Sequence, residues 1–364
     1  MTRSKRLLTY SLVLAAMALP ALLGAVSSTG VIFLLIEPGS RPGGMAEAYV
    51  AQVDDAFAGF WNAGAMAFNR KTQFAGMHTN WFGDVDGIDD MYYEYLGWNQ
   101  YFQDIGNIGM HIIYLTYGKQ DRIDEQGVYL DTFTSYELAA AVSYASQIRE
   151  RIGVGVTFKY ILSDLAPEGT GSSEAGVKGR GMSWAVDLGL QIRGINLYYY
   201  DLPRLSFGLN IQNIGPNITY INESQADVLP LNWRMGFSYL VLGSLDKDAK
   251  DYNRFTINAD MNKVLDDKSV NPISRIFTSW SDDAAKYERE ETVFSLGAEY
   301  TYYNLLSLRA GHIWDKAGSI EGPSFGVGMQ YTFSNRYKVN FDFAMQQAGE
   351  LTDYNKTFSL GVEF

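Results

Sequence analysis

The sequence predicts an all-β fold, a transmembrane antiparallel β-barrel of about fourteen strands with an N-terminal plug segment. Three observations lead to this fold class. Large apolar side chains alternate with polar residues or glycine along many segments of about 9 to 11 residues, the length that a tilted strand needs to cross a bilayer. The chain has 36 Gly beside 7 Trp, 25 Tyr and 20 Phe, a composition typical of strands and turns. Long and short connections largely alternate between the segments, as in an up-and-down barrel.

Composition excludes several other classes of protein. A content of 47% hydrophobic and 19% charged residues is too apolar for a disordered chain. The absence of cysteine excludes a disulfide scaffold, a thiol nucleophile and a lipoprotein anchor. The formal net charge of −12 provides no basic face for displacing counterions from nucleic acid, so no nucleic-acid partner is predicted.

Residues 1–27 have the pattern of a secretory signal peptide. Arg3, Lys5 and Arg6 precede an apolar run, and small residues near Ala25 supply a cleavage site. A membrane-anchor helix is the alternative, and it is disfavoured because Pro20 ends the apolar run early. Cleavage would remove the three basic residues and change the net charge from −12 to −15.

Residues 28–72 differ from the rest of the chain, because they are rich in Gly and Ala and lack sustained alternation. Phe33, Phe57, Phe60 and Trp61 are bulky apolar side chains that need to be buried somewhere. We therefore expect this segment to fold into the barrel lumen as a plug. A disordered or peripheral N-terminus is the alternative.

The barrel itself is predicted over residues 73–364. The C-terminal segment illustrates the pattern, since Phe358, Leu360, Val362 and Phe364 alternate with a polar residue or glycine. Applied along the chain, the same criterion gives an even number of strands, fourteen, as single-chain bacterial barrels have. They are expected at 73–81, 91–100, 107–117, 134–145, 151–161, 183–194, 204–214, 231–242, 253–264, 292–303, 305–313, 323–333, 336–346 and 356–364.

Alternation alone would also suit a soluble β-sandwich, whose apolar face is its core. Strand length argues against it, because soluble strands usually have about 5 to 6 residues. Aromatic residues also gather at the strand ends, for example at Trp81, Trp98 and 198–200, as in the interfacial girdles of outer-membrane barrels. A final strand that ends in Phe364 is the terminal arrangement of barrels inserted by the outer-membrane assembly machinery.

Connection lengths give the strands a direction. If the first strand rises from the periplasm, the longer connections face outward and are mostly rich in Gly, Ser, Asn and Asp. The inner turns are short at 146–150, 304 and 334–335, and longer at 195–203 and 243–252. The expected outer loops are 82–90, 118–133, 162–182, 215–230, 265–291, 314–322 and 347–355.

Several motifs carry a resemblance to a known family. They are Phe33 to Met45, Asp54-Asp55-Ala56 and Trp61-Asn62-Ala63 near the N-terminus, then 160–165, 210–215, 260–265, 271–273 and 296–300. In their order and spacing the chain resembles the PorV family, outer-membrane barrels of the Bacteroidetes type IX secretion system within the FadL-like group of fourteen-stranded barrels. The family motif in the plug comprises Pro38, Ser40, Arg41, Gly43, Met45, Asp54, Asp55, Trp61 and Asn62.

This resemblance implies a role in protein transport without enzymatic activity and without a cofactor. Proteins of the family associate with the giant SprA-like translocon barrel, receive cargo through its secreted C-terminal signal domain, and carry it to the surface attachment complex. The resemblance therefore implies three protein partners, together with outer-membrane lipid, and localisation in the cell outer membrane of a Gram-negative bacterium.

The longest outer loop, 265–291, is a candidate partner-docking site. Ile273, Ile276, Phe277 and Trp280 fall at roughly helical spacing, which predicts an amphipathic helix that docks on a partner barrel. The alternative, packing over the mouth of its own barrel, is left open by the sequence.

Other constellations indicate no catalytic or metal site. The acidic run 84–90 lacks the spacing of a twelve-residue calcium loop and is interpreted as a solvated loop. The three histidines, His78, His111 and His312, are too scattered for metal ligands, and no nucleophile with a base is evident. Polar residues expected on the lumen face are predicted to pair with one another or with the plug, namely Lys159, Asp187, Arg234, Asp260, Glu299, Arg309 and Asp342.

Two further functions remain open at this point. A FadL-like transporter for hydrophobic small molecules is suggested by the Gly/Ala-rich plug and by Phe57, Phe60 and Trp61, which would line its pocket. The second open function is that of an enzyme, because relatives have been linked to O-deacylation of lipopolysaccharide. The sequence shows no nucleophile with a base for this reaction.

Overall fold

The computed structural model describes residues 29–81, 90–124, 127–167, 179–197, 200–220, 226–245, 251–265, 271–281, 289–333, 336–349 and 354–364. The predicted signal peptide lies outside these ranges, as does most of the acidic run 84–90. Among the described residues, no helix is both long enough and apolar enough to cross a membrane.

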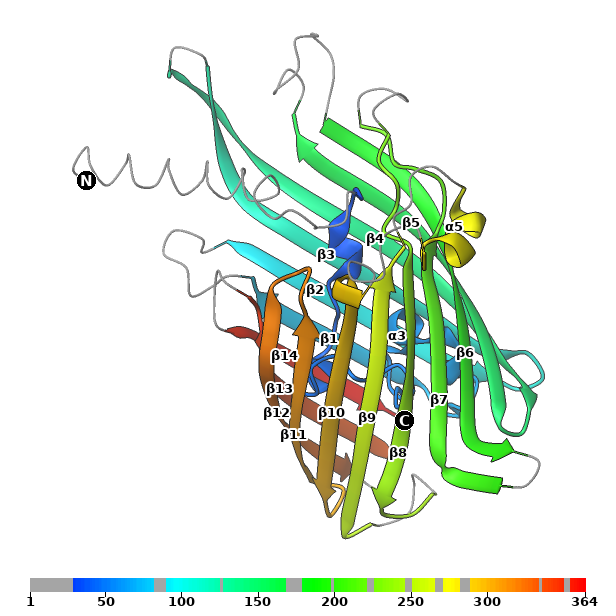
Figure 1. The fold of residues 1–364 in the computed structure, drawn as a ribbon. Helices are drawn as coiled ribbons and strands as arrows, with labels where there is room; N and C mark the ends of the chain where they lie inside the picture. The colour runs from blue at the N-terminus through cyan, green and yellow to red at the C-terminus, as the bar shows by residue number, and fades with distance from the viewer. Residues whose placement is uncertain are drawn as a thin grey trace.

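Fourteen antiparallel strands close into one barrel, in which each strand pairs with its sequence neighbours (Figure 1). The closure joins the first strand to the last, with Gln73 opposite Glu363 and Thr79 opposite Thr357. The predicted fold class is therefore confirmed. The strands are β1 (Gln73–Asn80), β2 (Met91–Phe102), β3 (Gly106–Ile123), β4 (Tyr129–Arg149), β5 (Ile152–Ala166), β6 (Gly179–Leu197), β7 (Tyr200–Ile214), β8 (Asn232–Leu242), β9 (Asn253–Val264), β10 (Thr292–Tyr302), β11 (Leu306–Asp315), β12 (Ile320–Phe333), β13 (Tyr337–Gln347) and β14 (Tyr354–Glu363).

The two faces of each strand differ as the alternation predicts. On β12 the side chains of Phe325, Val327 and Met329 are about half exposed on the outer wall, whereas Ser324, just before them, is fully buried. An apolar outer wall and a polar inner face are typical of a barrel in a bilayer, whose outer side chains face lipid. Lipid offers the backbone no hydrogen bonds, and closure of the sheet leaves no strand edge unpaired.

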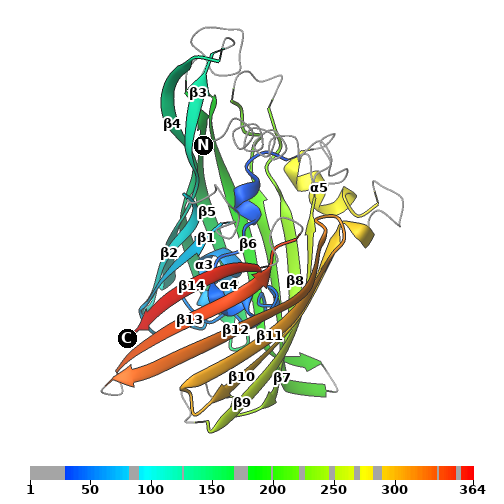
Figure 2. The ribbon, with the colours of Figure 1, turned by 90° about the vertical axis from the view of Figure 1, so that its left-hand side faces the viewer.

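Several strands are longer than the sequence predicts. The segment 118–133 is not the expected loop, because β3 and β4 continue as a paired hairpin to Ile123 and Tyr129. Figures 1 and 2 show this hairpin reaching well beyond the neighbouring strands. Beyond the apolar belt both faces of a strand can meet water, so the alternation that marks a strand disappears there. β5, β6 and β7 also extend into predicted connections for the same reason.

The two ends of the barrel are distinct. One end, called the turn end here, carries the start of β1, the end of β14 and short connections such as 103–105, 150–151 and 303–305. The opposite end, the loop end, carries longer connections that include helix α5 (Pro272–Thr278). Short turns are typical of the periplasmic side of outer-membrane barrels.

The N-terminal segment, residues 29–72, crosses the interior between these ends. Near the loop end Gly30 N donates to Val228 O at 3.0 Å, and at the turn end Thr72 N donates to Phe364 O at 2.9 Å. The segment forms short helices, namely η1 (Ile32–Leu35), α2 (Ser40–Gly43), α3 (Ala58–Trp61) and α4 (Ala63–Met66). Helix α4 contacts β4, β5 and β6, whereas α2 contacts β12, β13 and β14 on the opposite wall. In Figure 2, α3 and α4 lie within the ring of strands.

Candidate functional site

The N-terminal segment is held to the inner wall by a network of charged side chains centred on Arg41 of α2. Its guanidinium binds both carboxylate oxygens of Glu299 on β10, each at 2.8 Å. It also contacts Asp54 Oδ1 at 2.5 Å. Arg309 on β11 binds the same Glu299 at 2.7 Å and reaches Asp342 on β13 at 2.6 Å. The network thus joins the segment to three strands on one side of the barrel, β10, β11 and β13.

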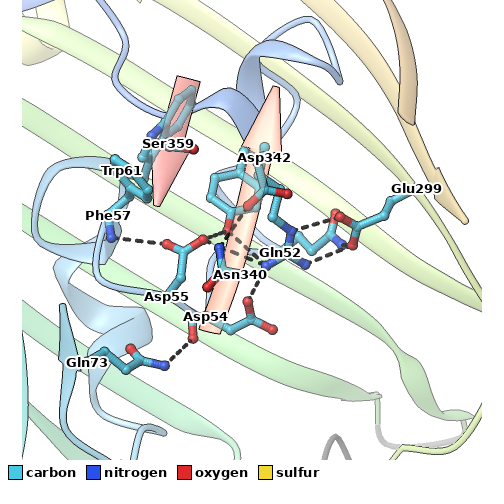
Figure 3. A network of polar contacts seen from close by, with 12 residues as sticks. Gln52, Asp54, Asp55, Phe57, Trp61, Gln73, Glu299, Asn340, Asp342 and Ser359 are labelled. Atoms are coloured by element: carbon cyan, nitrogen blue, oxygen red, sulfur yellow. Dashed lines mark hydrogen bonds and ion pairs between the residues drawn. The ribbon is translucent and has the colours of Figure 1, made fainter. Parts of the chain in front are cut away.

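Figure 3 shows how further polar groups complete this network. Gln52 donates to Glu299 Oε1 at 2.7 Å, and Gln73 of β1 donates to the backbone oxygen of Asp54 at 3.0 Å. The Tyr49 hydroxyl donates to Asp55 Oδ2 at 2.6 Å. Burial raises the pKa of Asp55, and the nearby Arg41 opposes this shift.

A second charged contact lies between Glu37 and Arg234 of β8, which form an ion pair in which both side chains are buried. The Arg234 guanidinium also stacks over the Trp61 ring, 4.4 Å from its centroid. Trp61 is 1% exposed, and its indole N–H donates to Pro38 O at 2.8 Å. These contacts hold Glu37 and Pro38, which precede α2, against Trp61 of α3, and they hold both parts of the segment against β8.

Backbone groups of the segment find partners on the inner wall as well. Asp260 Oδ2 on β9 accepts from Tyr49 N at 2.7 Å and from Val50 N at 2.8 Å. The Asn62 amide donates to Val50 O at 3.1 Å and to Leu190 O of β6 at 3.0 Å. Because buried backbone groups without partners are costly, these side chains make the irregular path of the segment possible.

Glycines on the inner wall let the segment approach closely. A Cβ atom built on Gly155 of β5 would lie 2.4 Å from the backbone of Ala63, and one on Gly208 of β7 would lie 2.3 Å from the Val50 carbonyl oxygen. Backbone atoms cannot move aside as a flexible side chain can. Part of the high glycine content therefore serves the contact between the segment and the strands.

The charged form of one carboxylate in the segment, that of Glu47, is disfavoured by its surroundings. Glu47 lies near Asp315 of β11 and accepts a hydrogen bond from Gln346. Burial, helped by repulsion from Asp315, raises the pKa of Glu47 from 4.5 to about 7. This residue therefore titrates near neutral pH.

The structure brings the family-motif residues together within this segment. Pro38, Ser40, Gly43, Met45, Trp61 and Asn62 are buried, and Arg41, Asp54 and Asp55 are partly buried in the network described above. Tyr49 and Gln52 also belong to this network and escaped the sequence reasoning, because nothing local marks which polar residue of an irregular segment meets a distant strand.

The predicted pairing of lumen residues is confirmed. Lys159 of β5 contacts Asp187 of β6 at 2.9 Å, and both side chains are 1% exposed. The remaining five residues pair with each other or with the N-terminal segment, as given above for Arg234, Asp260, Glu299, Arg309 and Asp342.

The candidate docking loop forms the short helix α5 at the loop end. Asn271 caps it by accepting from Ile273 N at 3.1 Å and Ser274 N at 3.0 Å. Ile273 and Phe277 lie one turn apart and are 66% and 76% exposed. Trp280 turns toward the barrel, since its ring packs edge-on against Trp233 of β8 at 5.6 Å. Its N–H donates to the backbone oxygen of Ile276 at 2.9 Å, and the Ile276 side chain is partly buried. Residues 266–270 and 282–288 of this loop lie outside the described part.

The three histidines lie apart from one another, as expected. His78 is on the outer wall, where its Nδ1 lies 2.7 Å from Glu94 Oε1. His111 is buried and stacks on Tyr95 with a centroid distance of 5.6 Å. His312 packs on Trp314 with a centroid distance of 4.3 Å. Asp90, the last residue of the acidic run and the one that is described, accepts from Lys119 N at 2.7 Å.

Comparison with protein families gives one match, which covers residues 24–270. The matching family is described as Type IX secretion system protein PorV. A comparison with curated proteins finds no match.

Solved structures with the same architecture include two transporters. The Pseudomonas putida toluene transporter TodX is 12% identical with a TM-score of 0.55, and the alignment covers 90% of this chain and 96% of TodX. The Ralstonia pickettii toluene transporter TbuX is 11% identical with a TM-score of 0.53, and the coverage is 91% and 99%. At these identities the likeness shows the fold alone. A Pseudomonas aeruginosa FadL homologue is 8% identical with a TM-score of 0.46, and the coverage is 93% of this chain and 99% of the homologue.

Proposed function

The chain belongs to the PorV family of type IX secretion system proteins, and from this premise we propose that its barrel carries secreted cargo between a translocon and the cell surface. It is an outer-membrane β-barrel component of that secretion system. In the proposed cycle the barrel associates with the SprA-like translocon barrel, receives cargo through the cargo's C-terminal signal domain, and delivers it to the surface attachment complex. The family match over residues 24–270 carries this proposal.

We further propose that the N-terminal segment is a plug that seals the lumen. The segment is tied near both ends of the barrel and contacts opposite walls through α2 and α4. Its ion pairs with β8 and β10 involve side chains that are largely buried on the barrel side. A barrel filled in this way suits a carrier that binds proteins at its rim better than a channel that conducts solutes.

The rim offers an apolar feature for such binding in the exposed pair Ile273 and Phe277 on α5. Arg275 lies on the opposite face of the helix, is 1% exposed, and donates to Leu229 O at 3.4 Å. Trp280 anchors the chain after the helix on Trp233. The helix is therefore held from below while its apolar pair faces outward, and we propose that this pair docks on the translocon barrel.

Affinity purification from native outer membrane, with a tag in a surface loop, tests the secretion role. We expect the translocon barrel and cargo C-terminal domains to co-purify with the protein. Recovery of the barrel without either partner would count against the proposal. Replacing the 272–281 segment by a Gly/Ser linker tests the docking helix separately, because unchanged recovery of the translocon would exclude that role while leaving the carrier function in place.

A transporter for hydrophobic small molecules is the second candidate, favoured by the shared architecture with TodX and TbuX. The aromatic residues that would line its pocket are instead packed within the protein. Phe57 stacks on Tyr95 at 4.7 Å, and Phe60 packs edge-on against Trp61 at 5.9 Å. Retention of fatty acid through the same purification would favour this candidate. We propose no catalytic activity for either role.

A further inference from the structure

We propose that a cavity at the turn end of the barrel is a binding site for a phosphate group. The cavity has a volume of about 300 Å³ and lies on the inner wall of β6 to β9, beside the N-terminal segment. The charged side chains that line it are Arg41, Arg151, Arg193, Arg204, Arg254 and one acid, Asp54. The lining of this cavity is therefore positively charged, although the net charge of the whole chain is −12.

Most of these arginines already have carboxylate partners. Arg41 binds Asp54 and Glu299, Arg151 lies 2.6 Å from Asp201, and Arg254 lies 3.5 Å from Asp251. The sole acid in the lining, Asp54, is therefore engaged by Arg41.

Arg193 and Arg204 differ from the others, since neither forms an ion pair among the described residues. The Arg193 guanidinium lies over the Phe68 ring, 4.4 Å from its centroid. Arg204 donates to Leu240 O at 3.2 Å. Both side chains point inward from neighbouring strands, because Arg193 is paired with Ser206 and Arg204 lies two residues before Ser206 on the same face of β7. Two partly buried guanidinium groups that lack an ion-pair contact are costly unless an anion occupies the space between them.

The remaining lining indicates which anion fits. Ser206, Ser238 and Thr256 place hydroxyl groups in the same cavity, so its polar surface consists mainly of hydrogen-bond donors. Guanidinium forks bind phosphate in a bidentate manner, and hydroxyls bind its remaining oxygens. A volume of about 300 Å³ is at the small end of ligand sites and suits a phosphate with a short attached group.

The cavity is reached from the turn end. A larger adjoining cavity of about 400 Å³ shares Arg41, Asp54, Arg193 and Arg254 with it and extends toward the ends of β1 and β14 at Lys71 and Glu363. The phosphate therefore comes either from solution at that side or from a phospholipid headgroup of the adjacent leaflet. Both sources present the same chemistry to the arginines.

Calorimetric titration of inorganic phosphate into the purified full-length barrel tests the proposal. We expect saturable binding, and loss of affinity by about tenfold or more for each of Arg193→Gln and Arg204→Gln, since each variant removes charge-assisted hydrogen bonds to the anion. Arg180→Gln is the matched control, because Arg180 lies on the same strand β6 at the loop end and is 3.6 Å from Asp164. This variant should bind phosphate as the unaltered chain does.

A second arm distinguishes the two sources. Nanodiscs that contain phosphatidic acid or only phosphatidylcholine are loaded with the protein, and lipid retained after extraction is counted by native mass spectrometry. Retention of phosphatidic acid that depends on Arg193 and Arg204 identifies a headgroup, whereas saturable binding of inorganic phosphate alone identifies the free ion.

Absence of both, or equal binding by the double glutamine variant, overturns the proposal. If the double glutamine variant fails to fold, the double lysine variant, Arg193→Lys with Arg204→Lys, retains both charges and replaces it in the test. Weaker phosphate binding by the double lysine variant supports the site, whereas unchanged binding overturns the proposal.

Discussion

Replacing Arg41 by alanine should weaken the attachment of the N-terminal segment to the barrel wall without unfolding the barrel. Removing one partner of a buried ion pair costs about 3 to 5 kcal/mol, because the other charge is left uncompensated. Here Glu299 keeps Arg309 at 2.7 Å and Gln52 at 2.7 Å, and the Asp54 side chain is 25% exposed. The lower end of that range, about 3 kcal/mol, is therefore the expected loss in the free energy that holds the segment in place.

The natural absence of cysteine provides the assay. Ser40 is buried and its hydroxyl has no hydrogen-bond partner within the described ranges, so Ser40→Cys is a nearly isosteric reporter of the inserted segment. If a maleimide reacts only when the segment opens, the labelling rate follows the opening equilibrium. A loss of about 3 kcal/mol then corresponds to a rise of roughly a hundredfold in the rate when Arg41→Ala is added. Thr278→Cys on α5, which is exposed in both backgrounds, should label at the same rate.

Arg122→Ala is the matched control for the loss of a guanidinium. Arg122 binds Asp131 on the β3–β4 hairpin through two hydrogen bonds, at 2.9 and 2.7 Å, far from the N-terminal segment. It should leave labelling of the Ser40→Cys reporter unchanged. A rate that rises less than about threefold in Arg41→Ala, with the barrel still folded by heat-modifiable gel mobility, would refute the claim that this network secures the segment.

Three further predictions concern other parts of the molecule. Because burial raises the pKa of Glu47 from 4.5 to about 7, the folded state still binds a proton that the unfolded state has lost above about pH 4.5. Stability should therefore fall by about 2.5 kcal/mol as pH rises from 4.5 to 7. Glu47→Gln should flatten this profile in thermal melts, and an unchanged slope would count against it. Gly155→Ala should lower the melting temperature because its Cβ would overlap the Ala63 backbone, whereas Gly76→Ala, whose Cβ has 4.0 Å of space, should not; equal melting temperatures would contradict this packing. Changing both Ile273 and Phe277 to serine should reduce co-purified translocon at least tenfold with no change in barrel stability, and full recovery would disprove docking through α5.

The fold was predictable because a membrane barrel imposes a period of two on every strand. The apolar face of a segment such as 323–333 must meet lipid, and its glycines and polar residues must meet the lumen, so the strand is visible in the sequence. Where β3 and β4 leave the apolar belt, the physical requirement ends and so does the signal.

The polar contacts inside the lumen were predictable in kind but not in detail. The alternation of the strand places Glu299 on the inner face, and a buried charge is costly without a partner. The sequence therefore predicts that Glu299 has a partner. The identity of that partner depends on barrel register and on the path of an irregular segment, and Arg41 lies 258 residues away in the chain. The helices of the segment have four residues each, too few for a helical period to appear. The same parity argument, applied to strand ends, would have found Arg193, Arg204 and Arg254.

The central claim, that this barrel serves protein secretion, is tested most directly by export itself. In a strain whose copy of the gene is deleted, cargo with the C-terminal signal domain should no longer reach the cell surface, as measured by quantitative immunolabelling of intact cells. Re-expression of the natural chain should restore surface cargo, and the Arg122→Ala variant should restore it equally. Normal surface cargo in the deletion strain would contradict the account.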